Sequence, residues 1–146
     1  MRTQVCDPWP RSVGQGSGVA VSSEIVVTGF LGQSVTLPCM YSSWSPNSNS
    51  MCWGKGQCPN SKCNDQLLHT DGTKVVSRKL AKYQLLGNIQ RGDVSLTIFN
   101  AKPDDSSVYC CRIEVPGWFN DRKTNIRLEL RGEHRRTRVC GGRGSG

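Results

Sequence analysis

Apolar and polar residues alternate along the middle of the chain in short segments, which are separated by Gly, Asn, Asp and Ser. In residues 34–39, and again in residues 94–98, every second position is apolar or Cys. Successive side chains of a β-strand point to opposite faces, so each segment predicts a strand with one core face and one solvent face. No apolar pattern of helical period is long enough to predict a helix. The pattern therefore predicts an all-β fold.

Five further segments continue this reading, and they are residues 51–54, 67–76, 83–86, 107–114 and 123–130. Within residues 67–76, the pair Asp71-Gly72 predicts a tight two-residue hairpin turn. The last two segments flank residues 116–121. We therefore expect residues 116–121 to form the tip of an antiparallel hairpin.

Four residues reproduce the immunoglobulin pattern of an inter-sheet disulfide, a packing Trp and a tyrosine corner. They are Cys39, Trp53, Tyr109 and Cys111, with Tyr109 two positions before the second Cys. The predicted hairpin at Asp71-Gly72 supplies the extra strands of a variable-type domain. The sequence predicts a variable-type immunoglobulin β-sandwich over residues 24–130, with residues 54–64 in the C–C′ loop and residues 116–121 in the F–G loop.

The predicted F–G tip carries Trp118 and Phe119 beside Asn120 and Asp121. Folded domains normally bury large aromatic side chains, so an exposed pair beside an amide and a carboxylate indicates a partner that is both apolar and ionic. A lipid surface met through a metal ion fits that description. The alternative is a protein-interaction surface, because F–G tips of variable domains often dock other immunoglobulin domains.

Eight cysteines in 146 residues indicate an oxidising compartment, so the chain is expected to be secreted or displayed on the cell surface. Residues 1–23 show no signal peptide, no membrane span is apparent, and residues 131–146 look unstructured. We expect both ends, with Cys6 and Cys140, to lie outside the fold. Of the net charge of +8, only +3 falls in residues 24–130, so nucleic-acid binding is not expected.

Strand parity places Cys110 and Cys52 on the outer face of one sheet, because their neighbours Cys111 and Trp53 point into the core. Cys58 and Cys63 lie in the C–C′ loop. The sequence allows three pairings among these four cysteines, and a Cys52–Cys63 bond with a Cys58–Cys110 bond would fold the loop against the sheet. Zinc is the competing interpretation. The spacings lack C-x₂-C knuckles and the compartment favours disulfides.

A C–C′ loop held in this way would lie beside the F–G loop and leave a cleft between them. Its first wall would carry Lys55, Asn60, Ser61 and Lys62, and its second would carry the four F–G residues. Asn120 and Asp121 offer the hard oxygen donors that calcium prefers, and backbone carbonyls would complete the shell. Ser61 and Lys62 would then meet a phosphate or carboxylate group.

The cysteine pattern and three motifs resemble the T-cell immunoglobulin and mucin domain family. The motifs are Met-Cys-Trp-Gly-Lys-Gly-Gln-Cys-Pro-Asn-Ser-Lys-Cys at 51–63, Gly-Asp-Val-Ser-Leu-Thr-Ile at 92–98, and Tyr-Cys-Cys-Arg-Ile-Glu-Val-Pro-Gly-Trp-Phe-Asn-Asp at 109–121. The resemblance covers about residues 24–130. It implies calcium-dependent binding of phosphatidylserine on membranes, and a role in recognising and engulfing apoptotic cells.

The resemblance also implies individual roles. Asn120 and Asp121 match the metal-binding pair, and Trp118 and Phe119 match the membrane-inserting tip. The positions that contact the lipid headgroup are Ser61 and Lys62. The implied disulfides are Cys39–Cys111, Cys52–Cys63 and Cys58–Cys110. Members of the family are single-pass cell-surface proteins with a leader, a mucin stalk, a transmembrane helix and a cytoplasmic tail. The resemblance makes this chain part of such an ectodomain, and since it shows none of these segments, its own anchoring and signalling are open.

The sequence also bears on integrin binding and on catalysis. Arg91-Gly92-Asp93 is an integrin-recognition tripeptide just before a predicted strand, although Gly-Asp alone would also form a turn. Catalysis is not expected, because the histidines are His69, in a predicted strand, and His134, in the tail. No nucleophile or carboxylate pair is placed for a triad or an acid–base dyad.

Overall fold

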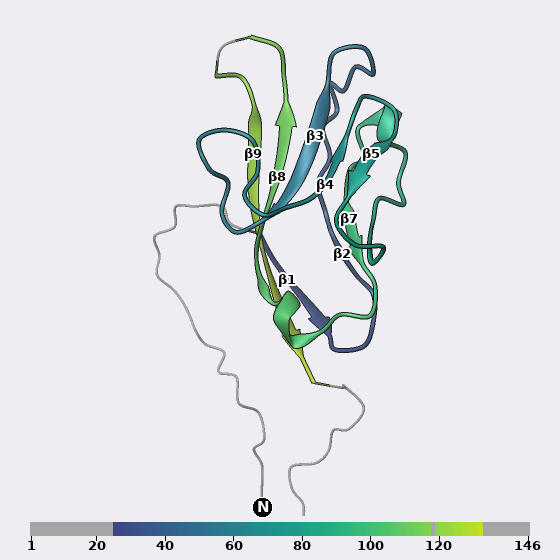
Figure 1. Ribbon diagram of the computed structural model, residues 1–146, viewed down its shortest axis with the longest axis vertical. Helices are drawn as coiled ribbons and strands as arrows, with labels where there is room; N and C mark the ends of the chain where they lie inside the picture. The colour runs from purple at the N-terminus through teal and green to yellow at the C-terminus, as the bar shows by residue number, and fades with distance from the viewer. Residues whose placement is uncertain (1–24, 118, 133–146) are drawn as a thin grey trace, which may run out of the picture. The chain divides into compact units, whose positions relative to one another are not determined.

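A six-stranded sheet and a three-stranded sheet form the two layers of the protein (Figure 1). The computed structural model describes residues 25–117 and 119–132, so predictions for residues 1–23, Trp118, His134 and Cys140 lie outside the described residues. The larger sheet has the order β1-β9-β8-β3-β4-β5, and the smaller has the order β2-β7-β6. The strands are β1 (Ile25–Phe30), β2 (Val35–Leu37), β3 (Ser50–Lys55), β4 (Gln66–Thr70), β5 (Val75–Arg78), β6 (Tyr83–Gln84), β7 (Leu96–Ile98), β8 (Ser107–Glu114) and β9 (Arg122–Arg131).

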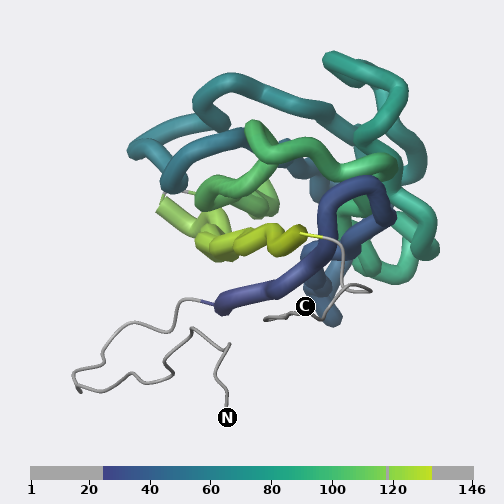
Figure 2. The backbone as a smooth tube through the Cα atoms, turned by 90° about the horizontal axis from the view of Figure 1, so that it is seen from below, coloured from purple at the N-terminus to yellow at the C-terminus, as the bar shows by residue number. Residues whose placement is uncertain are grey.

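This order is that of a variable-type immunoglobulin sandwich, as predicted, with β3, β4, β8 and β9 as strands C, C′, F and G. Strand β1 pairs in parallel with β9, and the two lie side by side in Figure 2 as the purple and yellow tubes. Two single-turn 3₁₀ helices, η1 (Ile89–Arg91) and η2 (Pro103–Asp105), complete the described elements. No helix within the described ranges is long and apolar enough to cross a membrane.

The predicted hairpin in residues 67–76 is confirmed as β4 and β5, but its turn lies one position later than expected. The N–H of Asp71 donates to the Lys74 carbonyl at 3.0 Å, so Gly72 and Thr73 are the central residues. The Asp71 carboxylate accepts the N–H groups of Thr73 and Lys74 at 2.8 and 2.9 Å, which lowers the pKa of Asp71 well below its ordinary value. Asp71 therefore opens the turn instead of occupying its centre.

The core lies between the two sheets and is tied across them by the predicted Cys39–Cys111 disulfide. Trp53 is fully buried, and its indole N–H donates to the Val94 carbonyl at 2.7 Å. The hydroxyl of Tyr109 donates to the Asp105 carbonyl, which forms the predicted tyrosine corner. Burial, and then the neighbouring Asp105 carboxylate, raise the pKa of Tyr109 well above its ordinary value. The disulfide and the tyrosine corner fix β8, the strand that leads into the F–G loop.

Candidate functional site

The C–C′ loop, residues 56–65, is fastened to the outer face of the larger sheet (Figure 1). Cys52 of β3 is bonded to Cys63, and Cys58 is bonded to Cys110 of β8, so the expected pairing is confirmed. The backbone N–H of Cys58 also donates to the side-chain oxygen of Asn125 on β9 at 2.9 Å. Three strands therefore hold this loop.

The close approach of the loop depends on Gly54 of β3. A Cβ atom at Gly54 would lie 2.5 Å from the Asn64 carbonyl oxygen and 2.9 Å from the Cβ of Cys63. Both distances are shorter than van der Waals contact, so any side chain at this position would push the loop off the sheet. Of the two neighbours Trp53 and Gly54, the first packs in the core and the second lets the C–C′ loop approach the sheet.

The F–G loop joins β8 to β9 through a tightly curved backbone. Gly117 and Phe119 have φ angles of 113° and 58°, and the side-chain amide of Asn120 donates to the Pro116 carbonyl at 2.8 Å. Phe119 is 99% exposed, so this half of the predicted aromatic tip stands in solvent. The loop thus presents an apolar ring directly before the two predicted metal ligands.

Asp121 lies at the base of the F–G loop and is partly buried. Its Oδ1 atom accepts the backbone N–H of Val115 at 3.2 Å, and its Oδ2 atom accepts the Nε–H of Arg112 at 2.9 Å. A carboxylate has about four lone-pair positions, so further coordination sites remain on both oxygens.

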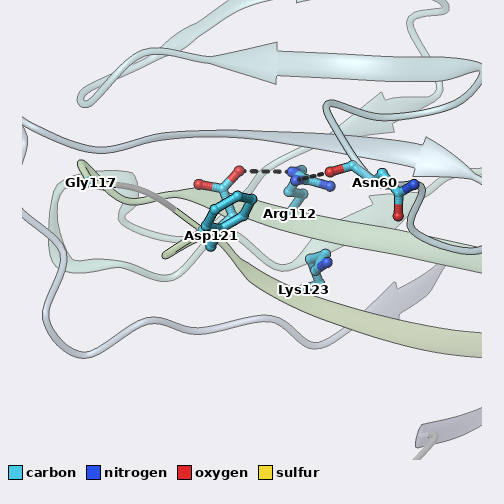
Figure 3. A pocket seen from close by; sticks show the side chains of 6 residues that line it. Asn60, Arg112, Gly117, Asp121 and Lys123 are labelled. Atoms are coloured by element: carbon cyan, nitrogen blue, oxygen red, sulfur yellow. Dashed lines mark hydrogen bonds and ion pairs between the residues drawn. The ribbon is translucent and has the colours of Figure 1, made fainter.

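Arg112 extends from β8 into the space between the two loops, where only 5% of the residue is exposed. Its Nη1 group donates to the carbonyls of Pro59 and Lys62 at 2.9 and 3.3 Å, and its Nη2 group donates to the carbonyl of Asn60 at 2.9 Å. Figure 3 shows the guanidinium between Asn60 and Asp121. Burying a cation is costly unless its donors are satisfied, and these acceptors satisfy the fork.

An open pocket of about 240 Å³ lies where the two loops meet. Its lining, drawn in Figure 3, consists of Asn60, Arg112, Gly117, Phe119, Asp121 and Lys123. Arg112 and Lys123 are opposite each other in the pairing of β8 with β9, so both side chains leave the sheet on the face that the pocket occupies. A pocket between the C–C′ and F–G loops therefore exists in the structure. Of the predicted wall residues, Asn60, Phe119 and Asp121 line it, whereas Lys55, Ser61, Lys62 and Asn120 are not among its described lining residues.

The donors around the F–G loop suit a hard divalent cation. The Asp121 carboxylate is anionic, and the amide oxygen of Asn120 has no hydrogen-bond partner among the described residues. A Cβ at Gly117 would lie 2.2 Å from the Asn120 amide nitrogen, so the loop closes this tightly only around glycine. Within residues 25–117 and 119–132, no three His, Cys, Asp or Glu side chains converge on a metal site. Calcium would thus depend on one carboxylate, one amide and carbonyl oxygens.

The other charged and polar residues predicted for the C–C′ wall differ in where their side chains lie. Ser61 and Lys62 are exposed on the C–C′ loop, and Lys62 adopts a positive φ of 58°. Lys55 was expected on the same wall, and this expectation is wrong. Its ammonium group donates to the Asp104 carbonyl at 2.6 Å, because the side chain points toward η2 and away from the F–G tip.

The Arg91-Gly92-Asp93 tripeptide does not form the exposed turn that the sequence suggested. Arg91 ends η1 and is exposed, but Gly92 is buried. A Cβ atom at Gly92 would lie 2.0 Å from the Tyr41 carbonyl oxygen, so a side chain does not fit there. Asp93 is half-buried and accepts the N–H of Ser95 at 3.2 Å. The segment is built into the domain wall, which disfavours its use as a flexible recognition loop.

Sequence reasoning missed Arg112 and Lys123 as pocket residues. Arg112 has the same strand parity as Cys110, so it had to point outward beneath a loop that Cys110 fastens. Lys123 follows from the register of β9 against β8. Parity was thus the available signal for Arg112, whereas Lys123 required the register.

Comparisons with known proteins agree with the immunoglobulin fold. Residues 22–130 match the immunoglobulin V-set domain family. T-cell immunoglobulin and mucin domain-containing protein 4 of Mus musculus and that of Homo sapiens are each 69% identical over 110 residues, which are 75% of this chain and 32% and 29% of those proteins. The chain thus spans about a third of the length of these relatives.

A solved structure described as Tim-4 in complex with phosphatidylserine has the same fold, with a TM-score of 0.73 and 68% sequence identity. The match covers 74% of this chain and 99% of that chain. The two molecules are therefore alike over the whole of the solved domain.

Proposed function

Since the chain belongs to the T-cell immunoglobulin and mucin domain family of V-set immunoglobulin proteins, we propose that it binds phosphatidylserine on membranes with calcium. The site is the pocket between the C–C′ and F–G loops. The observation that carries the proposal is the fully exposed Phe119 beside the Asp121 carboxylate at the mouth of that pocket. The likeness to a phosphatidylserine-bound domain at 68% identity supports the same ligand class. The biological role that follows is recognition and engulfment of apoptotic cells from outside the cell.

Asn120 and Asp121 would hold the calcium ion through their side-chain oxygens. Calcium supplies positive charge that attracts the anionic headgroup and shares its oxygens. The carbonyls of Pro59, Asn60 and Lys62 point to Arg112, so carbonyl donors for the ion are expected from the F–G loop. The metal is thus assigned to the F–G loop, and the C–C′ loop is left for the headgroup.

Ser61 and Lys62 are the proposed headgroup contacts on the C–C′ loop. Both are exposed, and each offers a donor to a phosphate or carboxylate oxygen. The two disulfides and the Cys58–Asn125 bond fix the loop before the lipid arrives. A preformed loop avoids much of the ordering cost that a mobile one would carry on binding.

Phe119 is the proposed membrane-inserting residue, together with Trp118, whose role is predicted from the sequence. A Phe side chain that moves from water into an apolar layer gains roughly 1.5–3 kcal/mol. Calcium and the headgroup contacts supply the polar half of the attachment, and the aromatic tip supplies the apolar half. Membrane binding is therefore expected to be stronger than binding of a soluble headgroup.

The test is co-sedimentation of the chain with liposomes that contain phosphatidylserine, and with liposomes of phosphatidylcholine alone. We expect binding to the first in calcium, and its loss when excess chelator is added. Undiminished binding in chelator would contradict the calcium role. Absence of binding to phosphatidylserine at any calcium concentration would contradict the lipid function, and would favour the alternative of an adhesion module that binds a protein.

A further inference from the structure

Arg112 contacts both walls of the pocket. Its Nε group binds Asp121 at 2.9 Å on the F–G side, and its two Nη groups bind three carbonyls of the C–C′ loop. The guanidinium is planar and rigid, so its donors keep a fixed relative geometry. A displacement of Asp121 therefore changes the bonds to Asn60 and its neighbours. The proposed metal ligand and the proposed headgroup loop are mechanically linked through one side chain.

The guanidinium also sets the charge of the pocket. Among its described lining residues, the one carboxylate is Asp121, which is already paired with Arg112, and Lys123 adds a second positive charge. Proteins tune calcium affinity through the number of anionic ligands, and a site with one neutralised carboxylate is poor in them. An anionic headgroup supplies the negative charge that the protein lacks. Calcium alone and the headgroup alone each meet an incomplete site.

We infer that Arg112 is a positioning residue that couples calcium to the anionic headgroup, so that each ligand binds weakly alone and strengthens the binding of the other. The inference rests on the proposed function. It goes further by assigning the coupling to a residue that is proposed neither as a metal ligand nor as a headgroup contact. Linkage requires the coupling to be reciprocal, so one factor describes both directions.

The coupling factor is the ratio of the calcium dissociation constants without and with a saturating soluble headgroup. The probe is glycerophosphoserine, measured by isothermal titration calorimetry, with a titration of calcium into the probe alone as the blank. Couplings between sites are commonly about 5- to 150-fold, and we expect about tenfold or more for the unmodified chain.

Two substitutions distinguish the effect of the planar guanidinium geometry from the effect of positive charge in the pocket. Arg112→Lys keeps the positive charge but has no planar fork to join Asp121 to the loop carbonyls. Lys123→Gln removes a positive charge from the same pocket but leaves the fork in place. We expect the coupling factor of Arg112→Lys to fall by more than about threefold, to the part that direct contact between calcium and the headgroup supplies. Lys123→Gln should keep a coupling factor within about threefold of the unmodified value, and should bind calcium alone more tightly.

An Arg112→Lys chain that is folded by thermal unfolding and near-UV circular dichroism, yet keeps the unmodified coupling factor, would overturn the inference. If that variant does not fold, nuclear magnetic resonance of the unmodified chain decides. Calcium without lipid should shift the Nε–H signal of Arg112 and the amide signals of residues 60–63, which carry no proposed metal ligand. Unshifted signals in calcium-bound protein would overturn it as well.

These results are distinct from failure of the proposed function. If the unmodified chain does not bind phosphatidylserine liposomes in calcium, the function itself is wrong. If it binds them and the coupling factor is insensitive to Arg112→Lys, only the role of Arg112 is wrong.

Discussion

Asn120 closes the F–G loop onto Pro116, because its side-chain amide donates to the Pro116 carbonyl at 2.8 Å directly under Gly117. The contact leaves no room for a Cβ atom between the two residues. The orientation of one proposed calcium ligand is therefore set by a glycine three positions earlier.

Replacing Gly117 by Ala is expected to weaken calcium binding without unfolding the domain. The new Cβ would lie 2.2 Å from the Asn120 amide nitrogen, and the φ of 113° is strained for any L side chain. The Asn120 contact must break, so the amide oxygen loses its position. Calcium titration in the presence of glycerophosphoserine should show about a tenfold loss or more, which is about 1.4 kcal/mol. Gly132→Ala, where nothing lies within 4 Å of the added atom, is the matched control.

Phe119→Ala should reduce liposome binding by about tenfold or more, since burying a Phe ring contributes roughly 1.5–3 kcal/mol. The side chain is 99% exposed, so the free energy of unfolding should change by no more than about 0.5 kcal/mol. Soluble headgroup binding should be almost unchanged, and the same separation is expected for Trp118→Ala. Leu86→Ala, at an apolar residue that is 66% exposed in the segment after β6, should leave liposome binding intact. Equal losses for Leu86 and Phe119 would argue against insertion of the tip.

Asp121→Asn is expected to abolish calcium-dependent attachment to phosphatidylserine liposomes. The substitution preserves size but removes the single carboxylate among the described pocket residues. It also leaves the guanidinium of Arg112, a residue that is 5% exposed, without its anionic partner, so some loss of stability should accompany it. Asp104→Asn removes an exposed carboxylate from η2 and should bind normally. Normal liposome binding by Asp121→Asn in calcium would contradict the assigned metal ligand.

Loss of the Cys58–Cys110 bond should loosen the C–C′ loop, which Cys52–Cys63 still ties to β3, while the core stays closed by Cys39–Cys111. For a chain with Ala at both positions, we expect the free energy of unfolding to fall by about 2–4 kcal/mol. Urea unfolding measures that change, and co-sedimentation should show weaker lipid binding at temperatures where the domain remains folded. Unaltered binding would mean that the loop does not need its attachment to β8.

Stability should decline in alkaline solution because the pKa of Tyr109 is raised by burial. The folded chain holds the phenolic proton more tightly than the unfolded chain, in which Tyr ionises near pH 10. The stabilising contribution is therefore full below about pH 10 and is lost as the pH rises further, by up to about 1.4 kcal/mol per pH unit. Tyr83, whose pKa is also raised by burial, acts in the same direction.

Tyr109→Phe provides the control for this pH dependence. It loses the hydrogen bond to the Asp105 carbonyl, which should lower the free energy of unfolding by about 1 kcal/mol at pH 7. Above pH 10 its stability should fall less steeply than that of the unmodified chain in urea unfolding experiments. Parallel pH curves would show that Tyr109 is not the titrating group.

The strands were readable from the sequence because alternation and turn residues act locally. Residues 107–114 were predicted as a strand, and β8 has these bounds. The segment 94–98 is longer than the observed strand β7, which covers only Leu96–Ile98. The ends of a strand depend on its hydrogen-bonded neighbours in the same sheet, here β2 and β6, and the alternation of one segment does not contain them.

The site was harder to predict because it depends on what covers the sheet. An Arg that faces outward from a strand is ordinarily solvated, and only the fastened C–C′ loop turns Arg112 into a buried residue with four acceptors. Lys55 shows the converse error. It adjoins the loop in sequence, but it pairs with Tyr109 near the start of β8, and its long side chain reaches η2. Nearness along the chain did not predict nearness to the ligand.

The neighbouring cysteines of β8 have a consequence for oxidative folding. Cys110 and Cys111 form bonds on opposite faces of one strand, to the loop and to the other sheet. A chain that oxidised Cys39 with Cys110 instead would have to turn β8 over, which would send Arg112 into the apolar interior and Tyr109 into water. The choice between these two thiols therefore decides which face of β8 points into the core, and the correct choice assembles the ligand pocket in the same step. A misoxidised molecule would lack both a core and a binding site, so partial activity is not an available outcome of that error.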